Sequence, residues 1–164
     1  MNARAHSAAT AALSVPRAGL VAATLRAKRR EHPALRGAPT LEALHAACDG
    51  EGIQVRYEEL PSAYFGCAFD LLGTAFVMMD RTLPTPLQRL VLAHEIAHHW
   101  LGHCRSVLIR DWRREETLAG GASRPIFDRC EAEADLLGAQ LLGLPVAAFR
   151  AAIESAASAL ESVA

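Results

Sequence analysis

Aromatic side chains are scarce in this chain. Phe, Trp and Tyr together make up 5% of its 164 residues, although 51% of the residues are hydrophobic. Alanine and leucine therefore supply most of the apolar surface, and both favour helices, which predicts a helix-rich protein. The length is sufficient for one compact domain with its own hydrophobic core.

The chain also lacks long apolar runs and paired cysteines. No apolar run reaches the ~20 residues that a membrane-spanning helix needs, so we expect no membrane partner. A short apolar stretch near the start is interrupted by Pro16 and Arg17, which argues against a secretory signal, while a transit peptide is a minor alternative. The cysteines form no C-x-x-C pair, so we expect reduced thiols in a cytoplasmic protein. They are Cys48, Cys67, Cys104 and Cys130.

Acidic residues are absent from the first 30 positions, which carry six basic residues. Because the net charge of the chain is −1, the remainder carries −7. The cluster at residues 26–30 suits contact with nucleic acid or an acidic partner, but a solvated helix end is the favoured interpretation, so we do not expect nucleic-acid binding. We predict that residues 1–37 are a basic extension, disordered to about residue 16 and then helical, and that residues 38–164 form a single domain.

The segment His94-Glu95-Ile96-Ala97-His98 has the pattern H-E-x-x-H. Two histidines four residues apart lie on one face of a helix, close enough to bind one metal ion. A glutamate beside the first histidine can act as general base for a metal-bound water. The flanking residues predict a helix over residues 86–101, with Thr85 as N-cap and Gln88 at the spacing of a capping box. Gly102 suits the position that follows the helix.

A third metal ligand is expected, because a catalytic zinc usually takes three from the protein and leaves one position open. A common form of the motif places a histidine six residues after the second one. That position holds Cys104, and His103 is displaced by one residue, so this form is disfavoured, although Cys104 stays an alternative ligand.

The better candidate lies in a second helical run that begins near Phe127. Glu131 and Asp135 share one helix face, so Glu131 can bind the metal while Asp135 accepts a hydrogen bond from a ligand histidine. Glu133 is rotated by about 200° from Glu131, and the two cannot both face the metal. We predict Zn²⁺ bound by His94, His98 and Glu131. Glu133 is the runner-up, or else a charge that favours the helix N-terminus.

Shorter patterns predict the remaining elements. Helices are expected over residues 18–30, 39–50 and 146–163, and strands over residues 53–57, 64–70 and 74–80, the last two as a hairpin. Residues 105–127 form a long connection, a kind of segment that is often functional or mobile. The predicted fold class is α+β: a small mixed β-sheet beside helices, with the metal between two of the helices.

Residues 41–145 resemble the ImmA/IrrE family of metallopeptidases. Residues 92–103 are very close to the signature helix of that family, and residues 131–145 resemble its second characteristic segment, except that Leu137 and Gly138 replace an aromatic residue and alanine. The resemblance implies a zincin-like core with H-E-x-x-H on the central helix. It also implies a zinc-dependent endopeptidase that often cleaves a DNA-binding repressor in a regulatory, stress or mobile-element response.

On this basis Glu95 is expected to be the catalytic base, and a repressor is the expected protein substrate. His99, His103 and Tyr64 are all candidates for the donor that stabilises the oxyanion. His103 is expected to have a structural role and to point away from the site. An extended substrate is expected to pair with an exposed edge of the strand at residues 74–80.

Two other classes of function fit parts of the sequence. One is a regulatory module that binds zinc, and with it a repressor or nucleic acid, without hydrolysis. The other is a nucleic-acid-binding protein led by its basic N-terminal residues. The presence of Glu95 favours the peptidase, because a purely structural zinc site does not require a base at this position.

Overall fold

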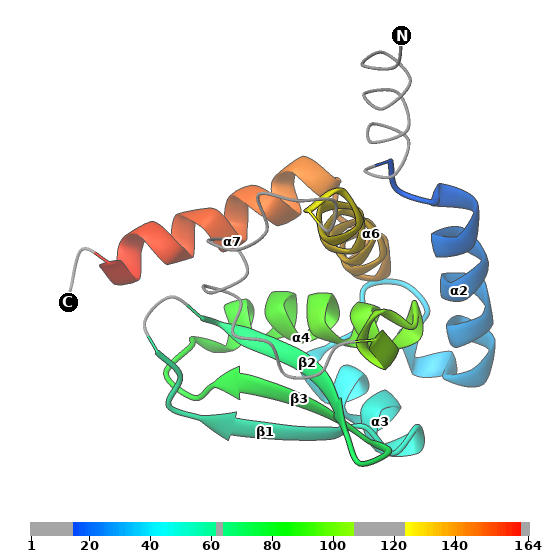
Figure 1. Cartoon of the computed structure of the whole chain (residues 1–164), viewed down its shortest axis with the longest axis horizontal. Coiled ribbons are helices and arrows are strands. Elements are labelled where there is room, and N and C mark those ends of the chain that lie inside the picture. The colour runs from blue at the N-terminus through cyan, green and yellow to red at the C-terminus, as the bar shows by residue number, and fades with distance from the viewer. Residues whose placement is uncertain (1–14, 62–63, 107–123, 162–164) are drawn as a thin grey trace, which may run out of the picture.

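The computed structural model of the chain describes residues 15–61, 64–106 and 124–161 (Figure 1). The disorder predicted for the start of the chain falls on residues 1–14, and most of the predicted long connection falls on residues 107–123. Both predictions therefore lie outside the described residues. Within them, helices and a small sheet form the predicted α+β fold.

The elements follow the sequence prediction closely. The helices are α2 (Ala18–Glu31), α3 (Leu41–Gly50), α4 (Thr85–Trp100), α6 (Arg124–Leu142) and α7 (Val146–Glu161), with 3₁₀ turns η1 (Pro33–Leu35) and η2 (His103–Ser106). The strands are β1 (Gln54–Glu58), β2 (Gly66–Leu71) and β3 (Thr74–Asp80). The elements differ from their predicted bounds by a few residues at most.

The sheet is mixed and has the strand order β1-β3-β2. β1 runs parallel to β3, and β2 runs antiparallel to β3 through the predicted hairpin. β3 lies in the middle, with Val77 and Met79 fully buried, so its predicted role as a free edge for substrate is wrong. Alternating apolar residues identify a strand but not its neighbours. The edge strand of the hairpin is β2, and no other described strand pairs with its second edge.

α4 lies between the sheet and the pair formed by α6 and α7 (Figure 1). It contacts β2 and β3 on one side and both of these helices on the other. Its apolar side chains are therefore buried on more than one face. The large ones are Leu87, Val91, Leu92 and Ile96.

The start of α4 differs from the prediction by one residue. Pro84 is the N-cap and Thr85 is the first helical residue, so the predicted Thr85 cap is wrong. Gln88 does not close a capping box, because its Nε2 donates to the carbonyl oxygen of Leu83 at 2.8 Å. No side chain caps this helix, and Pro86 lies in its first turn, where the fixed φ of proline suits a helix and no backbone N–H is needed.

α2 packs along α6, the helix that carries Glu131. Val21 and Leu25 are buried, and the Arg29 guanidinium donates to the carbonyl oxygens of Gln140 at 3.1 Å and Leu141 at 3.4 Å. Carbonyls in the last turn of a helix lack partners within that helix, so Arg29 satisfies groups at the end of α6. The predicted domain division at residue 37 stays a prediction.

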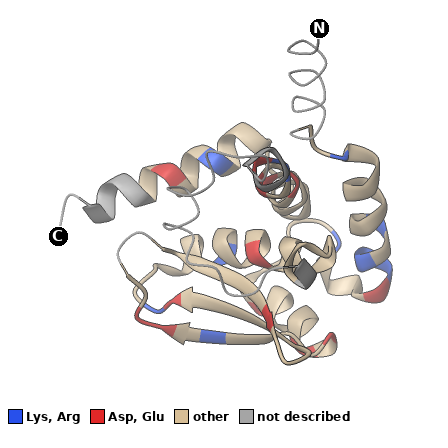
Figure 2. Ribbon diagram, in the orientation of Figure 1, with Lys and Arg blue, Asp and Glu red and all other residues tan. Residues whose placement is uncertain are grey.

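Most of the basic residues of α2 lie in its last turn (Figure 2). Lys28 forms ion pairs with Glu31 at 2.9 Å and with Glu51 at 2.8 Å, and it lies over the ring of Trp100. The side chains of Lys28 and Arg29 therefore bind partners within the chain and are not freely solvated.

Two expectations from composition meet the structure here. The four cysteines are free, as predicted. Among the described residues, no single helix has the length and apolar character needed to cross a membrane; α6 and α7 meet that test only when counted together, and they are bent by 104°.

The contact between β2 and α4 depends on Gly66. A Cβ at this position would lie 2.8 Å from Val91 Cγ1, 3.1 Å from the carbonyl oxygen of Met78 and 3.2 Å from Glu95 Cγ. Only glycine, which has no side chain, lets β2 approach α4 this closely.

Gly66→Ala is expected to lower the free energy of unfolding by about 1–3 kcal/mol, because the added methyl group overpacks the contact between β2 and α4. Thermal or urea unfolding measures the change. Gly19→Ala is the matched control: no atom lies within 4 Å of its Cβ position, and it should be neutral or stabilising. Equal stability of the two variants would contradict the close-approach argument.

Candidate metal centre

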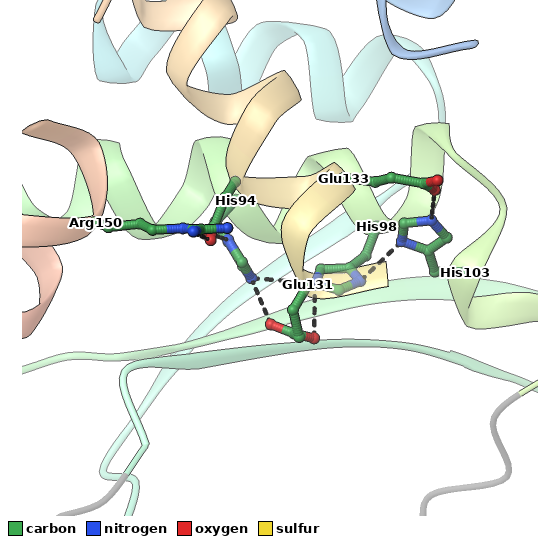
Figure 3. Close-up of polar contacts among 7 residues, drawn as sticks. His94, His98, His103, Glu131, Glu133 and Arg150 are labelled. Carbon is green, nitrogen blue, oxygen red and sulfur yellow. Dashed lines mark hydrogen bonds and ion pairs between the residues drawn. The ribbon is translucent and has the colours of Figure 1, made fainter. Parts of the chain in front are cut away.

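Three possible ligands converge between α4 and α6 (Figure 3). The Nε2 atoms of His94 and His98 are 3.1 Å apart. Glu131 reaches from α6 and places one carboxylate oxygen 3.3 Å from His94 Nε2 and the other 3.4 Å from His98 Nε2. The structure therefore brings together the three residues that the sequence predicts as ligands. Their binding of a metal stays a prediction.

The spacing of these three donors suits zinc. Zinc binds imidazole nitrogen and carboxylate oxygen at about 2.0–2.2 Å, and a tetrahedral angle then separates neighbouring donors by about 3.3–3.6 Å. The observed separations of 3.1, 3.3 and 3.4 Å lie close to that range. Two imidazoles and one carboxylate also form a donor set typical of catalytic zinc. Cys104, the alternative ligand, is buried outside this group.

His94 is oriented by a carboxylate, as predicted. Its Nδ1 lies 3.0 Å from Asp135 Oδ1, and the other oxygen of Asp135 accepts a hydrogen bond from Arg150 Nε at 2.5 Å. Burial lowers the pKa of His94, but hydrogen bonds to Asp135 and Glu131 outweigh it and raise this pKa to about 10. The carboxylates thus make the ring a strong base, and a metal at Nε2 would take the place of its proton.

His98 is the opposite case. Burial lowers its pKa well below the usual value, and repulsion by the neighbouring histidines lowers it further. The ring is therefore neutral, which is the form that binds a metal. Its Nδ1 lies 3.1 Å from His103 Nδ1.

His103 does not point away from the site, so that prediction is wrong. The prediction assumed that the helix continues, but α4 ends at Trp100, and the turn that follows contains Gly102 at φ 75°. η2 then brings the ring of His103 back against His98, with ring centroids 5.1 Å apart. The expected structural role of His103 thus consists of a direct contact with a candidate ligand.

Glu133 does not belong to the ligand group, and it is not a solvated charge at a helix end. Its side chain is 0% exposed and accepts hydrogen bonds from His103 Nε2 at 3.1 Å and from Arg17. Arg17 donates from its backbone N, Nε and Nη2, each at 2.8 Å. Burial raises the pKa of Glu133, but the bonds from Arg17 and His103 outweigh it and lower this pKa to about 2. Its interpretation as a charge favouring the helix N-terminus is therefore wrong.

Glu95 lies beside the three ligands and is buried. Burial raises its pKa to about 7, against the attraction of His94 and with added repulsion from Glu131. A carboxyl group with a pKa near neutrality can both accept and donate a proton at physiological pH, which is what a general acid and base requires.

A cavity of about 460 Å³ opens onto this group. His94, Glu95 and Glu131 line it on one side, and Tyr64, Phe65 and Ile153 are among the residues of the other walls. Structural zinc sites are closed by four protein ligands, whereas a catalytic site keeps an open position for water or substrate. The arrangement here is of the open kind.

Only one of the three candidate oxyanion donors lines the cavity, and it is Tyr64. The ring of His99 is used elsewhere: its Nε2 donates to the carbonyl oxygen of Phe76 at 2.8 Å, and its Nδ1 lies 3.5 Å from Asp70. His103 is held between His98 and Glu133.

Arg17, Arg150 and Gly66 were not predicted from the sequence. Each acts through a partner on another element, and Arg17 lies 116 residues before Glu133. Their partners Glu133 and Asp135 were visible in the sequence as acids on a predicted helix. An acid on a buried helix face indicates that a basic partner is needed. The residues around each arginine, however, do not indicate which arginine pairs with these acids.

A second group of possible ligands consists of Glu31, His32 and Glu51. The ammonium group of Lys28 already lies against both of its acids, at 2.9 and 2.8 Å. A resident cation explains this cluster without a metal.

Residues 48–164, more than half of the chain, match the Peptidase M78 family, described as the IrrE N-terminal-like domain. The chain belongs to this family. The resemblance to ImmA/IrrE metallopeptidases is thereby confirmed, and the matched residues form a zinc metallopeptidase-like domain. No curated protein matches the chain. The M78 match begins after α2 and η1, so the segment that contains Arg17 precedes it.

Glu131→Ala is expected to remove bound zinc, because two histidines alone do not complete the ligand set. The loss of affinity should exceed the ~10–100-fold typical of losing an outer partner of a ligand. Elemental analysis and competition with a chelator measure it. Asp128→Ala, an exposed acid on the same helix, should bind zinc like the wild type. Full zinc content in Glu131→Ala would remove Glu131 from the ligand set.

Proposed function

We propose that this protein is a zinc-dependent endopeptidase that cleaves a DNA-binding transcriptional repressor in the cytoplasm. The observation that supports hydrolysis is the position of Glu95, a buried carboxyl group beside three convergent ligands at the wall of a cavity. Zinc, when bound, supplies an acidified water, with a pKa near ~7, and polarises the substrate carbonyl.

The ligands and the base have separate tasks. His94 and His98 offer neutral nitrogen atoms and Glu131 offers one negative charge, so a divalent ion held by these ligands would keep a net charge of +1 to attract the substrate carbonyl. Glu95 accepts a proton from the attacking water and later donates it to the leaving amine. Its pKa of about 7 suits both steps.

Tyr64 is the proposed donor to the carbonyl oxygen, which gains negative charge during attack. The hydroxyl of a phenol can donate one hydrogen bond. Its location in the cavity wall supports this role. A donor placed where charge develops stabilises the transition state more than the ground state.

We propose that the substrate binds in an extended conformation along β2. This strand begins at Gly66, which lines the cavity together with Phe65. No described strand pairs with its second edge, so its backbone groups can bond to a peptide in the manner of an added strand. Val91 and Ile153 add apolar wall for a substrate side chain.

A repressor is the proposed partner because of the resemblance to ImmA/IrrE peptidases. A direct role in nucleic-acid binding is not proposed for the basic N-terminal residues. Arg17 and Lys28 bind Glu133 and Glu51, and Arg29 binds backbone carbonyls, so these three cations are engaged within the chain.

Glu95→Gln is expected to retain zinc and to lower kcat by about 10²–10⁴-fold, because the amide cannot accept the proton. Zinc content is measured by elemental analysis. Cleavage is measured by mass spectrometry of new N-termini in cell extracts treated with wild type or variant, followed by purified candidate repressors. Undiminished cleavage would remove the general-base role. Stoichiometric zinc in the wild type with no new N-terminus would instead favour the non-hydrolytic regulatory module.

Tyr64→Phe is expected to lower kcat by about 10²–10³-fold with little change in KM, because it removes one donor to the oxyanion. Tyr57→Phe is the matched control: its hydroxyl bonds to His45 Nε2 at 2.7 Å, away from the cavity. The control should lose about 1 kcal/mol of stability and keep its kcat. Equal kcat in both variants would exclude Tyr64 as the donor.

A further inference from the structure

The two candidate histidine ligands have matching surroundings on their far sides. His94 bonds to Asp135, and Asp135 is held by Arg150 from α7. His98 bonds to His103, His103 bonds to Glu133, and Glu133 is held by Arg17. Each ligand thus ends in a carboxylate of α6 that an arginine from another segment fixes.

The hydrogens on the His98 side have only one consistent order. A metal at His98 Nε2 requires a lone pair there, so the neutral ring carries its hydrogen on Nδ1. That hydrogen is donated to His103 Nδ1 across 3.1 Å. The hydrogen of His103 is then on Nε2 and is donated to Glu133 across 3.1 Å. The position of Glu133 therefore fixes the tautomer and the orientation of both rings.

Arg17 determines the position of Glu133. It binds both carboxylate oxygens through Nε and Nη2, and one of them also through its backbone N, all at 2.8 Å. Arg129 is nearby but does not substitute: its Nε lies 3.9 Å from Glu133 and has no hydrogen-bond partner among the described residues. A bidentate guanidinium fixes both the plane and the distance of a carboxylate.

The segment that supplies Arg17 has further contacts besides this ion pair. Arg17 is the N-cap residue of α2, which packs on α6 through the buried side chains of Val21 and Leu25 and is bound at its other end by Arg29. The contact therefore does not depend on a loose arm finding its partner. It also lies outside residues 48–164, which carry the family match.

We propose that Arg17 is a positioning residue of the metal centre, which acts through Glu133 and His103 to hold His98 in its metal-binding tautomer and orientation. The inference rests on the proposed zinc site but not on peptide cleavage. Its consequence is that α2, through its N-cap residue Arg17, supports the metal centre. Displacing the segment before α2 then loosens the metal without touching any ligand.

The test compares Arg17→Ala, Arg17→Lys and Arg26→Ala in the full chain loaded with Zn²⁺ or Co²⁺. Arg26 is exposed on the same helix and is the control for charge. We expect Arg17→Ala to bind Zn²⁺ about 10–100-fold more weakly, as is typical when an outer partner of a ligand is lost. Arg17→Lys should fall between, because one ammonium cannot replace a bidentate pair, although the backbone N–H bond survives. Arg26→Ala should match the wild type.

Two readouts separate positioning from stability. The visible spectrum of bound Co²⁺ reports ligand geometry, and nitrogen-15 NMR of the zinc-loaded protein reports which nitrogen of His98 and His103 carries hydrogen. Both should change in Arg17→Ala and stay unchanged in Arg26→Ala. If Arg17→Ala does not fold, as judged by circular dichroism, Arg17→Lys is judged by the same criteria.

A lower unfolding temperature in Arg17→Ala, with wild-type Zn²⁺ affinity, Co²⁺ spectrum and tautomers, would overturn the proposal, because Arg17 would then be only structural. Faster metal release in Arg17→Ala would support the role of Arg17 even if the wild type cleaves no protein. The proposed peptidase function can therefore be wrong while the proposal for Arg17 holds. A wild type that binds no Zn²⁺ would overturn both.

Discussion

The packing of α4 against α6 is the contact on which the rest of the structure depends. The three candidate ligands are divided between these helices, so they converge only at one separation of the two. That separation is small at Gly138, where a Cβ would lie 3.3 Å from the backbone of Ala93 and 3.0 Å from the ring of Phe149. Ala93 directly precedes His94. The buried ring of Phe149, from α7, fills the space beside the glycine.

The acidic residues of α6 also depend on charged partners from neighbouring elements. Besides Asp128, this helix carries three acids at a spacing of two residues, and their surroundings differ. Glu131 lies against His94 and His98, Glu133 is buried behind them, and Asp135 lies beside His94. A buried carboxylate is costly unless it is paired and fully hydrogen-bonded. α7 and the segment before α2 supply the arginines that meet this requirement. The elements that flank α6 are thus part of the electrostatics of the site and not only of its packing.

The sequence was sufficient where the signal is local. The i,i+4 spacing of His94 and His98 and the rotation between Glu131 and Glu133 follow from helix geometry alone, and the structure agrees with both. It was insufficient where a contact joins distant segments or depends on the conformation of a turn. Strand order, and with it the edge position of β2 among the described strands, depends on pairing between segments that are not adjacent in the sequence. The return of His103 to the site depends on a turn of a few residues, and the Arg17 contact depends on how α2 docks.

The separation of Arg17 and Glu133 by 116 residues also has a consequence in time. At ribosomal rates of ~5–20 residues per second, Arg17 is synthesised roughly 6–23 s before its partner exists. During that interval α2 has no α6 to pack on, and H-E-x-x-H leaves the ribosome without Glu131. The proposed metal centre therefore cannot form before α6 has been made, and a nascent chain carries no complete ligand set until then.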